Sequence, residues 1–524
     1  MNANKNYKCY NNKKKELSPP MENISRRTFL KGVLAGSTAL FINGCFPNLL
    51  PKTQTDPELT PNVEFVIRSQ EGILPLFAGK ETVVWRYKGE VTKGDPVALA
   101  ALDGSYLGPI FHVERGQIVR IHYQNQLPES SIIHWHGLHV PPEADGHPRL
   151  AIDGGETYVY TFEVTDRAGT YWYHPHPHGR TAKQVMAGMA GLFIVHDDEE
   201  RALGLPAGQN DLPLVLQDRV IDRSNQFVYA PGGMMHQMTG FLGNQILVNG
   251  FLDYQLSVRT EAYRLRLLNG SNARIYKVAW DDGTPITVMA TDGGLLETPV
   301  VKPYVVVAPG QRLDIWVDFG GEPIGSLKKL VNLGHEAPGG THTFDLVRFR
   351  LAEQGKLYPL LPEKLSTHEE FSVDDAVNTN QPRLFTLAMG RGMRFTINGR
   401  VFQMNQTAPD ESVRLNDIEV WEFDNTVFGG MGMMGGMSVP HPMHIHGLQF
   451  RILSRDQSRV DRWLWNSLAD GLIDDGWHDT VLVLPGERVR VLVKFEDYTG
   501  LYLYHCHNLE HEDMGMMRNY RITA

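Results

Sequence analysis

From Val63 onward, short apolar runs alternate with polar residues, and Gly, Pro, Asn and Asp interrupt them about every ten residues. An alternation with period two is typical of β-strands, and long segments with a helical period are missing. The pattern therefore predicts an all-β protein built of β-sandwiches rather than βαβ units. The clearest predicted strands are residues 117–123, 263–268, 312–319 and 488–495.

The 524 residues are too many for one core and suggest about three domains of ~150 residues each. Two long polar stretches with Gly and Pro, residues 197–211 and 352–383, are the expected linkers. We therefore expect a leader over residues 1–45 and three sandwich domains over residues 61–200, 205–360 and 383–524.

An internal repeat supports this division. Residues 168–176, Ala-Gly-Thr-Tyr-Trp-Tyr-His-Pro-His, align with residues 499–507, Thr-Gly-Leu-Tyr-Leu-Tyr-His-Cys-His. Likewise His134-Trp-His-Gly-Leu aligns with His444-Ile-His-Gly-Leu. The first and third domains therefore share histidine motifs.

The middle domain shares with the other domains only a sequence pattern typical of a β-strand. Its Ala-Pro-Gly-Gln-Arg-Leu-Asp-Ile-Trp-Val-Asp-Phe run, residues 308–319, resembles residues 484–495, Leu-Pro-Gly-Glu-Arg-Val-Arg-Val-Leu-Val-Lys-Phe. No histidine pair accompanies that run, so the middle domain is expected to hold no metal ligands.

Histidines separated by one residue occur in duplicated contexts. On a strand, residues i and i+2 point to the same face, so each pair offers two imidazoles to one side. Imidazole binds copper, zinc and iron, so the ligand type alone leaves the metal open. The pairs are His134 and His136, His174 and His176, His444 and His446, and His505 and His507.

Cys506 lies between two of these histidines, so its sulfur must point to the opposite face of the strand. There it can meet His511 and Met516, with His441 as the natural second imidazole. Two His, one Cys and a weak axial Met describe a blue-copper electron-transfer site. Electrons arriving at Cys506 would have a short through-bond route to the histidine cluster, where dioxygen is the expected acceptor.

These motifs closely resemble those of the multicopper oxidases, the family of laccases, ferroxidases and bacterial cuprous oxidases. They are His134-Trp-His-Gly, His174-Pro-His-Pro-His-Gly, His441-Pro-Met-His-Ile-His-Gly and the run from His505 to Met516, and the resemblance extends from about residue 63 to the end. It implies three cupredoxin-like Greek-key β-sandwich domains and four copper ions: one type 1, one type 2 and two type 3.

The resemblance also implies which residues bind each copper. Type 2 copper would take His134 and His444, and type 1 copper would take His441, Cys506, His511 and Met516. The type 3 pair would take His136, His174, His176, His446, His505 and His507.

Other residues are expected near these sites. The resemblance places Asp145 and Glu512 as proton-delivering carboxylates, since reduction of oxygen to water consumes protons. His178 is expected beside the ligands, and His139 and His478 at a rim.

The electron donor is open between Cu(I) and a phenolic compound. A Gly- and Met-rich stretch precedes His441 and should overhang the type 1 site, and thioethers are soft ligands suited to Cu(I). An adaptable apolar lid of methionines would serve an organic phenol equally well. Residues 363–381, where cuprous oxidases tend to have Met, have none. The candidate Cu(I) ligands are Met431, Met433, Met434 and Met437.

A different class of function must be considered: a copper-binding protein without turnover, either an electron carrier or an envelope scaffold on the same fold. A carrier would need Cys506 and its partners but not the histidine pairs. Degenerate scaffolds lose ligands, whereas this chain keeps all of the expected positions. An oxidase that takes electrons from the donor and reduces O2 is therefore favoured.

The composition limits partners and location. Apolar residues make up 42% and charged residues 21%, which excludes disordered and fibrous classes, and only three cysteines exist, which excludes a disulfide-built fold. Residues 1–45 are basic, so the remainder of this chain of net charge −10 is strongly acidic. We therefore expect no nucleic-acid partner, and we expect a monomer.

The leader predicts export. Ser25-Arg-Arg-Thr-Phe-Leu-Lys31 before a short apolar stretch resembles a twin-arginine signal, which predicts a periplasmic or exported protein. Met21 lies where a start codon is usual. Lipid anchoring at Cys45 is disfavoured because Asn43 fits a lipoprotein motif poorly. No apolar run reaches the ~20 residues needed for a transmembrane span.

Overall fold

The computed structural model describes residues 52–53, 59–229, 234–369, 371–389, 394–426 and 439–524. The leader with Met21 and Cys45, and the candidate Cu(I) ligands Met431, Met433, Met434 and Met437, lie outside these ranges. Within the described ranges, no helix has the length and apolar character needed to cross a membrane.

The first group of strands forms two five-stranded sheets, in the orders β1-β8-β6-β2-β3 and β4-β5-β10-β9-β7. Phe65, Phe111 and Trp135, from strands of both sheets, meet in one core between them. The strands are β1 (Lys52–Thr53), β2 (Val63–Leu74), β3 (Thr82–Lys93), β4 (Leu99–Ala100), β5 (Ile110–Glu114), β6 (Ile118–Asn125), β7 (Ile133–His136), β8 (Thr157–Glu163), β9 (Gly169–Pro175) and β10 (Gly191–His196). The helices are η2 (Pro96–Ala98), η3 (Pro148–Leu150), α2 (Thr181–Met186) and α3 (Asp198–Ala202).

The second group has a six-stranded sheet, β12-β11-β14-β19-β16-β17, and a five-stranded sheet, β13-β21-β20-β15-β18. Leu265, Trp280 and Phe349 belong to its core. Its strands are β11 (Asp211–Arg219), β12 (Gln245–Val248), β13 (Gln255–Thr260), β14 (Ala262–Asn269), β15 (Tyr276–Trp280), β16 (Ile286–Thr291), β17 (Gly294–Lys302), β18 (Val305–Val307), β19 (Arg312–Asp318), β20 (Leu327–Asn332) and β21 (Phe344–Gln354), with η4 (Gly208–Asn210) and α4 (Met234–Thr239).

The third group again has two five-stranded sheets, β23-β22-β25-β29-β27 and β24-β31-β30-β26-β28. Trp421, Tyr504 and Cys506 belong to its core. Its strands are β22 (Arg383–Met389), β23 (Phe395–Ile397), β24 (Ser412–Arg414), β25 (Ile418–Asp424), β26 (His441–Ile445), β27 (Phe450–Asp456), β28 (Thr480–Val483), β29 (Arg488–Lys494), β30 (Gly500–Cys506) and β31 (Met517–Thr523). The helices in and before it are η5 (Val373–Asp375), η7 (Pro409–Glu411), α5 (Arg462–Leu468), η8 (Ala469–Gly471) and α6 (Leu509–Asp513).

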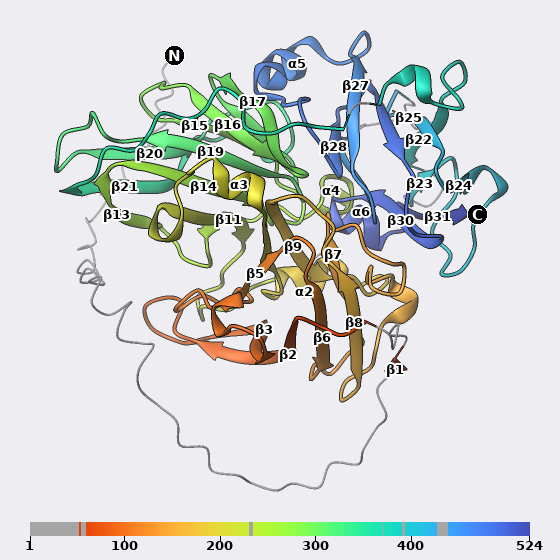
Figure 1. Cartoon of the computed structure of the whole chain (residues 1–524), viewed down its shortest axis with the longest axis horizontal. Helices are drawn as coiled ribbons and strands as arrows, with labels where there is room; N and C mark the ends of the chain where they lie inside the picture. The colour runs from red at the N-terminus through yellow and green to blue at the C-terminus, as the bar shows by residue number, and fades with distance from the viewer. Residues whose placement is uncertain (1–51, 54–58, 230–233, 370, 390–393, 427–438) are drawn as a thin grey trace, which may run out of the picture. The chain divides into compact units, whose positions relative to one another are not determined.

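Three two-sheet sandwiches confirm the predicted all-β fold class (Figure 1). The four clearest alternating runs form β6, β14, β19 and β29. In β6 every second side chain is buried, as expected for a strand with one face on the core. Neighbouring strands are often distant in the chain; β2, for example, pairs in parallel with β6, so strands cross between sheets as they do in Greek-key sandwiches.

Small apolar clusters join the sandwiches pairwise. Leu192 of the first packs with Leu268 of the second, and Leu468 of the third packs with Ala308 of the second. Val185 on α2 packs with Leu509 on α6, so the first and third sandwiches also touch. These contacts bring the histidine-bearing strands of the first and third sandwiches together.

Candidate metal centre

The paired strands place the histidine motifs opposite one another. β7 runs antiparallel to β9 with His134 opposite His174, and β26 runs antiparallel to β30 with His444 opposite His505. The first and third sandwiches therefore present the same arrangement, as their sequence repeat suggests.

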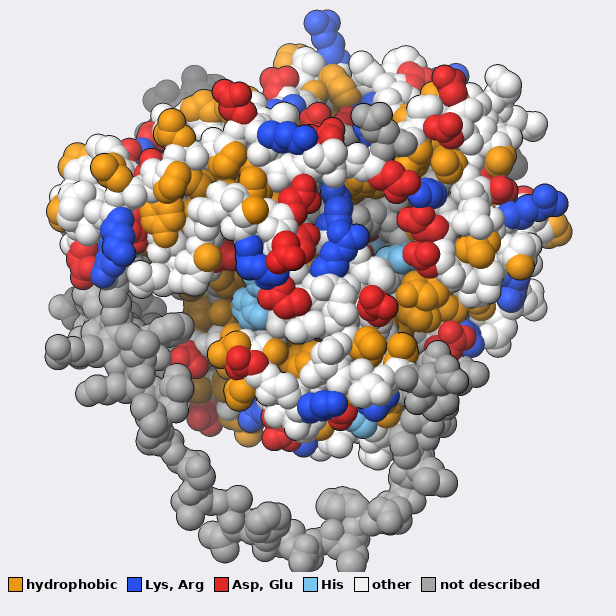
Figure 2. All heavy atoms as spheres, in the orientation of Figure 1, with side chains coloured by type: hydrophobic (Ala, Val, Ile, Leu, Met, Phe, Trp, Pro, Cys, Tyr) orange, Lys and Arg blue, Asp and Glu red, His pale blue; other side chains and the backbone are white. Residues whose placement is uncertain are grey.

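Eight imidazoles meet between these two sandwiches. Nε2 of His134 lies 3.3 Å from Nε2 of His444, 310 residues along the chain. Nε2 of His505 lies 3.0 Å from Nε2 of His446 and 3.4 Å from Nε2 of His176. All eight rings are fully buried, whereas the surface in Figure 2 carries interspersed acidic and basic side chains. The cluster consists of His134, His136, His174, His176, His444, His446, His505 and His507.

Backbone carbonyls fix the tautomers of four of these rings. Nδ1 of His134 lies 2.6 Å from the carbonyl oxygen of Asp145, and Nδ1 of His444 lies 2.8 Å from that of Asp479. His174 and His505 make the same contact with Pro175 and Cys506. A carbonyl oxygen only accepts, so each Nδ1 carries the proton and each Nε2 keeps a lone pair for a metal ion.

Several buried ring nitrogens have no hydrogen-bond partner at all, and this tests whether the cluster fits a metal. They are Nδ1 of His136, Nε2 of His174, Nδ1 of His176 and both nitrogens of His507. A buried polar atom without a partner costs about 1–3 kcal/mol, so a bound ion that takes one nitrogen of each ring would satisfy atoms such as Nδ1 of His136 and Nε2 of His174. Burial, and then the neighbouring imidazoles, lower the pKa of His134, His176 and His507 well below the usual value. The rings are thus neutral at pH 7, as metal ligands must be. The donor set fits copper ions.

A second cluster surrounds Cys506 on the other face of β30. Its Sγ lies 3.4 Å from Nδ1 of His441 and 3.6 Å from Nδ1 of His511, and these two nitrogens are 3.3 Å apart. Met516 is fully buried in the same core, and its carbonyl oxygen accepts a hydrogen bond from the backbone N–H of Cys506. Burial raises the pKa of the Cys506 thiol, and a bound metal would be needed to hold it as thiolate.

The outer edge of this second cluster is covered by the middle sandwich. Nε2 of His511 donates to the carbonyl oxygen of Met238 on α4, at 2.9 Å, which leaves Nδ1 free to face Cys506. The buried carboxylate of Glu510 accepts hydrogen bonds from the backbone N–H of Phe241 and from Asn272. Residues of the middle sandwich are therefore in direct contact with His511 and Glu510 of the third.

Asp145 and Glu512 are both buried against the histidine cluster. Oδ2 of Asp145 accepts a hydrogen bond from Nδ1 of His446 at 2.9 Å. The carboxylate oxygens of Glu512 lie 3.6 Å from Nε2 of His176 and 3.3 Å from Nδ1 of His505. Burial raises the pKa of each carboxyl well above its usual value.

Sequence reasoning missed Asp479 and Arg312. Asp479 lies with His136 and His444 in one group of potential ligand atoms, and its Oδ1 is 2.8 Å from Nε2 of His136. Although burial opposes ionisation, the guanidinium of Arg312 holds the pKa of Asp479 well below its usual value. The signal that the sequence offers is the repeated Pro-Gly-X-Arg motif that contains Arg312, which by itself indicates no more than a strand.

Three neighbouring histidines differ in their burial, and one of them, His478, differs from expectation. His478 is buried, 2% exposed, with Nε2 donating to the carbonyl of Asp475, so it does not line a rim. His178 is exposed, and its ring centroid lies 4.9 Å from that of Phe402. His139 remains partly exposed and bonds to Asp497. The spacing of these histidines in the sequence does not reveal which of them is buried, because their burial depends on how other strands pack against them.

The fold and the two buried clusters define a protein of cupredoxin-like sandwiches with two groups of potential metal ligands. Residues 86–200 and 376–524 match family models described as multicopper oxidase. Multicopper oxidase mco of Staphylococcus aureus is 32% identical over 83% of this chain and 86% of its own. The crystal structure of McoA multicopper oxidase from Aquifex aeolicus shares 36% identity with a TM-score of 0.75, covering 89% of this chain and 97% of that one. Cell division protein FtsP of Xenorhabdus nematophila is 29% identical over 94% and 97% of the two chains.

The chain belongs to the multicopper oxidase family. It is accordingly an oxidoreductase with copper as cofactor and with O2 and a reduced donor as substrates.

Proposed function

We propose that the protein takes single electrons from a reduced donor at Cys506 and reduces O2 to water at the histidine cluster. The observation that carries this proposal is the position of Cys506 between His505 and His507. Cys506 Sγ faces His441 and His511, while the two flanking histidines lie in the other cluster. Consecutive residues thus connect the two sites covalently, which suits electron transfer between them.

The ligand sets follow the family pattern. Type 1 copper takes His441, Cys506, His511 and Met516, and type 2 copper takes His134 and His444. The type 3 pair takes His136, His174, His176, His446, His505 and His507. The 3.3 Å contact between His134 and His444 and the unpartnered nitrogens of His507 support these assignments. We assign the domains to residues 61–200, 205–360 and 383–524.

Bound copper supplies single-electron transfer at one site and the binding and reduction of dioxygen at the other. The chain itself supplies protons and exclusion of water. Asp145 is in contact with His446, and Glu512 lies against His176 and His505, so each carboxyl can hold a proton next to the reacting centre. Oδ1 of Asp145 lies 3.5 Å from Nδ1 of His134, so this carboxyl is next to histidines of both sandwiches.

The donor is Cu(I), for copper tolerance, or a phenolic compound, as for a laccase. We propose that the methionines at positions 431, 433, 434 and 437, which shortly precede His441 in the sequence, bind Cu(I), because thioethers are soft ligands. We also propose export through the twin-arginine signal, without lipid anchoring at Cys45, and a monomeric state.

Oxygen uptake by the copper-loaded protein tests the proposal. Cu(I) and a simple phenol serve as rival donors, each with the Cys506→Ser variant as control. We expect uptake that requires Cys506, and the faster donor identifies the substrate class. Deleting residues 431–437 should slow Cu(I) oxidation alone if these methionines bind the ion.

A scaffold role is the second candidate, because a relative of similar coverage is named as a cell division protein. The presence of every expected ligand position favours the oxidase. A protein that binds its full complement of copper and yet consumes no oxygen with either donor would reverse this preference.

A further inference from the structure

The middle sandwich contains none of the proposed copper ligands, yet one of its turns is in contact with the histidine cluster. Residues 308–311 connect β18 to β19. A Cβ added to Gly310 would lie 3.1 Å from Cε1 of His136 and 3.1 Å from Cδ2 of His507, and the φ of Gly310 is +88°. Both the close approach and the positive φ require glycine here. This turn therefore packs directly against two proposed ligands.

Arg312 follows this turn as the first residue of β19, and every N–H of its guanidinium group donates a hydrogen bond. Nη1 and Nη2 donate to the two carboxylate oxygens of Asp479 at 2.9 and 2.6 Å. Nε donates to the carbonyl of Thr170, and the remaining N–H groups donate to the carbonyls of Gly310 and Asp292. The side chain is fully buried. One arginine of the middle sandwich thus binds Thr170 of the first sandwich and Asp479 of the third.

The carboxylate that Arg312 holds determines the orientation of His136. Oδ1 of Asp479 accepts from Nε2 of His136 at 2.8 Å, and the unpartnered Nδ1 of His136 is then the atom left for a metal ion. The same aspartate presents its backbone carbonyl to Nδ1 of His444. A shift of Asp479 would therefore disturb His136 and His444 together.

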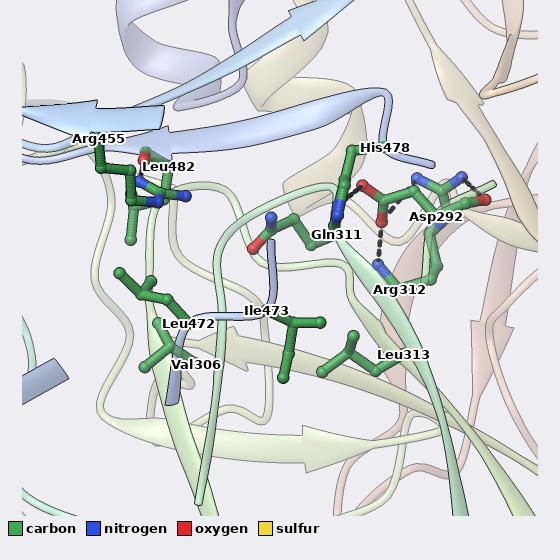
Figure 3. Close-up of a pocket in the computed structure, with 10 residues that line it drawn as sticks. All are labelled: Asp292, Val306, Gln311, Arg312, Leu313, Arg455, Leu472, Ile473, His478 and Leu482. Atoms are coloured by element: carbon green, nitrogen blue, oxygen red, sulfur yellow. Dashed lines mark hydrogen bonds and ion pairs between the residues drawn. The ribbon is translucent and has the colours of Figure 1, made fainter. Parts of the chain in front are cut away.

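The surroundings of Arg312 hold it rigidly. Its backbone N–H donates to Oδ1 of Asp292 at 2.7 Å, and Asp292 also faces His478. Figure 3 shows these residues and Gln311 around a cavity of about 10 Å³, room for about one water molecule. These contacts fix Arg312 in the position from which it donates two hydrogen bonds to Asp479.

The repeated turn in the third sandwich provides a comparison. Arg488 occupies the place of Arg312 in the Leu484-Pro-Gly-Glu-Arg488 phrase. Its side chain is 41% exposed and forms an ion pair with Asp424, at 3.1 Å. The two arginines thus share a local sequence but differ in burial and in hydrogen-bond partners.

We propose that Arg312 is a positioning residue for the copper cluster, acting through Asp479 on His136 and His444. The inference rests on the proposed function, because it takes these histidines as copper ligands. It gives the middle sandwich, which has no ligands of its own, a role in assembling the site.

Copper binding by Arg312→Gln, Arg312→Lys and the matched Arg488→Gln tests the proposal. Each variant is titrated with copper against a competing chelator, and the visible absorption of the Cys506 site is recorded separately from the copper held per chain. We expect Arg312→Gln to lose about 10- to 100-fold in copper affinity at the histidine cluster while the Cys506 absorption persists. Arg312→Lys, which keeps the charge but not the bidentate geometry, should lose less, and Arg488→Gln should match wild type.

A double variant separates positioning from a general structural effect. If Arg312 acts through Asp479, Arg312→Gln should add little to the loss caused by Asp479→Asn. Wild-type cluster affinity in Arg312→Gln, or losses that multiply in the double variant, would overturn the proposal. If Arg312→Gln does not fold, the selective loss in Arg312→Lys decides in the same way. A wild-type protein without copper at the histidine cluster would instead contradict the proposed function.

Discussion

His505 and Cys506 are consecutive residues of β30, and their side chains lie in two different buried clusters. Nε2 of His505 is 3.0 Å from Nε2 of His446, while Sγ of Cys506 is 3.4 Å from Nδ1 of His441. Strand geometry makes this separation unavoidable, because adjacent side chains leave opposite faces.

The two sites should accordingly be separable by single substitutions. Cys506→Ser should abolish the visible absorption of the copper–thiolate bond and leave one copper fewer per chain. His505→Ala should keep that absorption but weaken copper binding at the histidine cluster by at least about 100-fold. Even the loss of a residue that only hydrogen-bonds to a metal ligand lowers metal affinity by about 10- to 100-fold. Visible spectroscopy with copper analysis checks both, and loss of the absorption in His505→Ala would contradict the separation.

Removal of copper should destabilise the protein. Five ring nitrogens in the histidine cluster are buried without a hydrogen-bond partner, and a ligand that binds only the folded chain stabilises it. At a free copper concentration of about 1,000 times Kd, the gain is about 4 kcal/mol per site, which raises Tm by about 4 °C per site when the whole chain unfolds together. Calorimetry of chelated and reconstituted protein measures this. Magnesium, which prefers oxygen ligands, serves as control and should leave Tm unchanged.

A buried charge network between the first two sandwiches should contribute strongly to stability. Arg264 of β14 is 2% exposed; it donates to Asp314 and to Glu200. Arg264→Met leaves both carboxylates without this partner, so we expect a loss of about 3–5 kcal/mol. Urea unfolding followed by tryptophan fluorescence measures the shift in midpoint.

The nearby Arg201 provides the matched control. It is half exposed and pairs with Glu114 and Asp198 at the surface. Arg201→Met should leave the urea midpoint unchanged, because solvent screens such pairs. Equal shifts for the two arginines would argue against the importance of the buried network.

His147 should make stability depend on pH. Burial lowers the pKa of His147 to about 4, and the positive charge of Arg149 contributes to this shift. Nε2 of the ring donates a hydrogen bond to Asn519, and Nδ1 accepts one from the backbone N–H of Arg149. In the unfolded chain the pKa is about 6.5, so between about pH 6.5 and pH 4 the unfolded state binds more protons. The stabilisation is full above pH 6.5 and is lost as the pH falls toward 4, by about 3 kcal/mol. His147→Gln should flatten this slope in urea unfolding, and identical slopes would exclude His147 as its source.

Much of the fold was predictable because β-strands leave a local pattern. Alternation in residues 117–123 predicted β6, and the duplicated His-X-His motifs predicted two matching domains. The same alternation in β14 did not indicate that its polar face, with Arg264 and Arg266, is buried. A polar face is the same in sequence whether water or another sandwich covers it.

The sequence by itself determined the fold class, the histidine pairs and the placement of Cys506 on the opposite face, because each follows from the two-residue period of a strand. The tertiary structure alone decided that His134 meets His444, that His511 is capped by the carbonyl of Met238, and that Arg312 reaches Asp479. These contacts join residues of different sandwiches. They depend on how the sandwiches pack, which no local pattern of residues encodes.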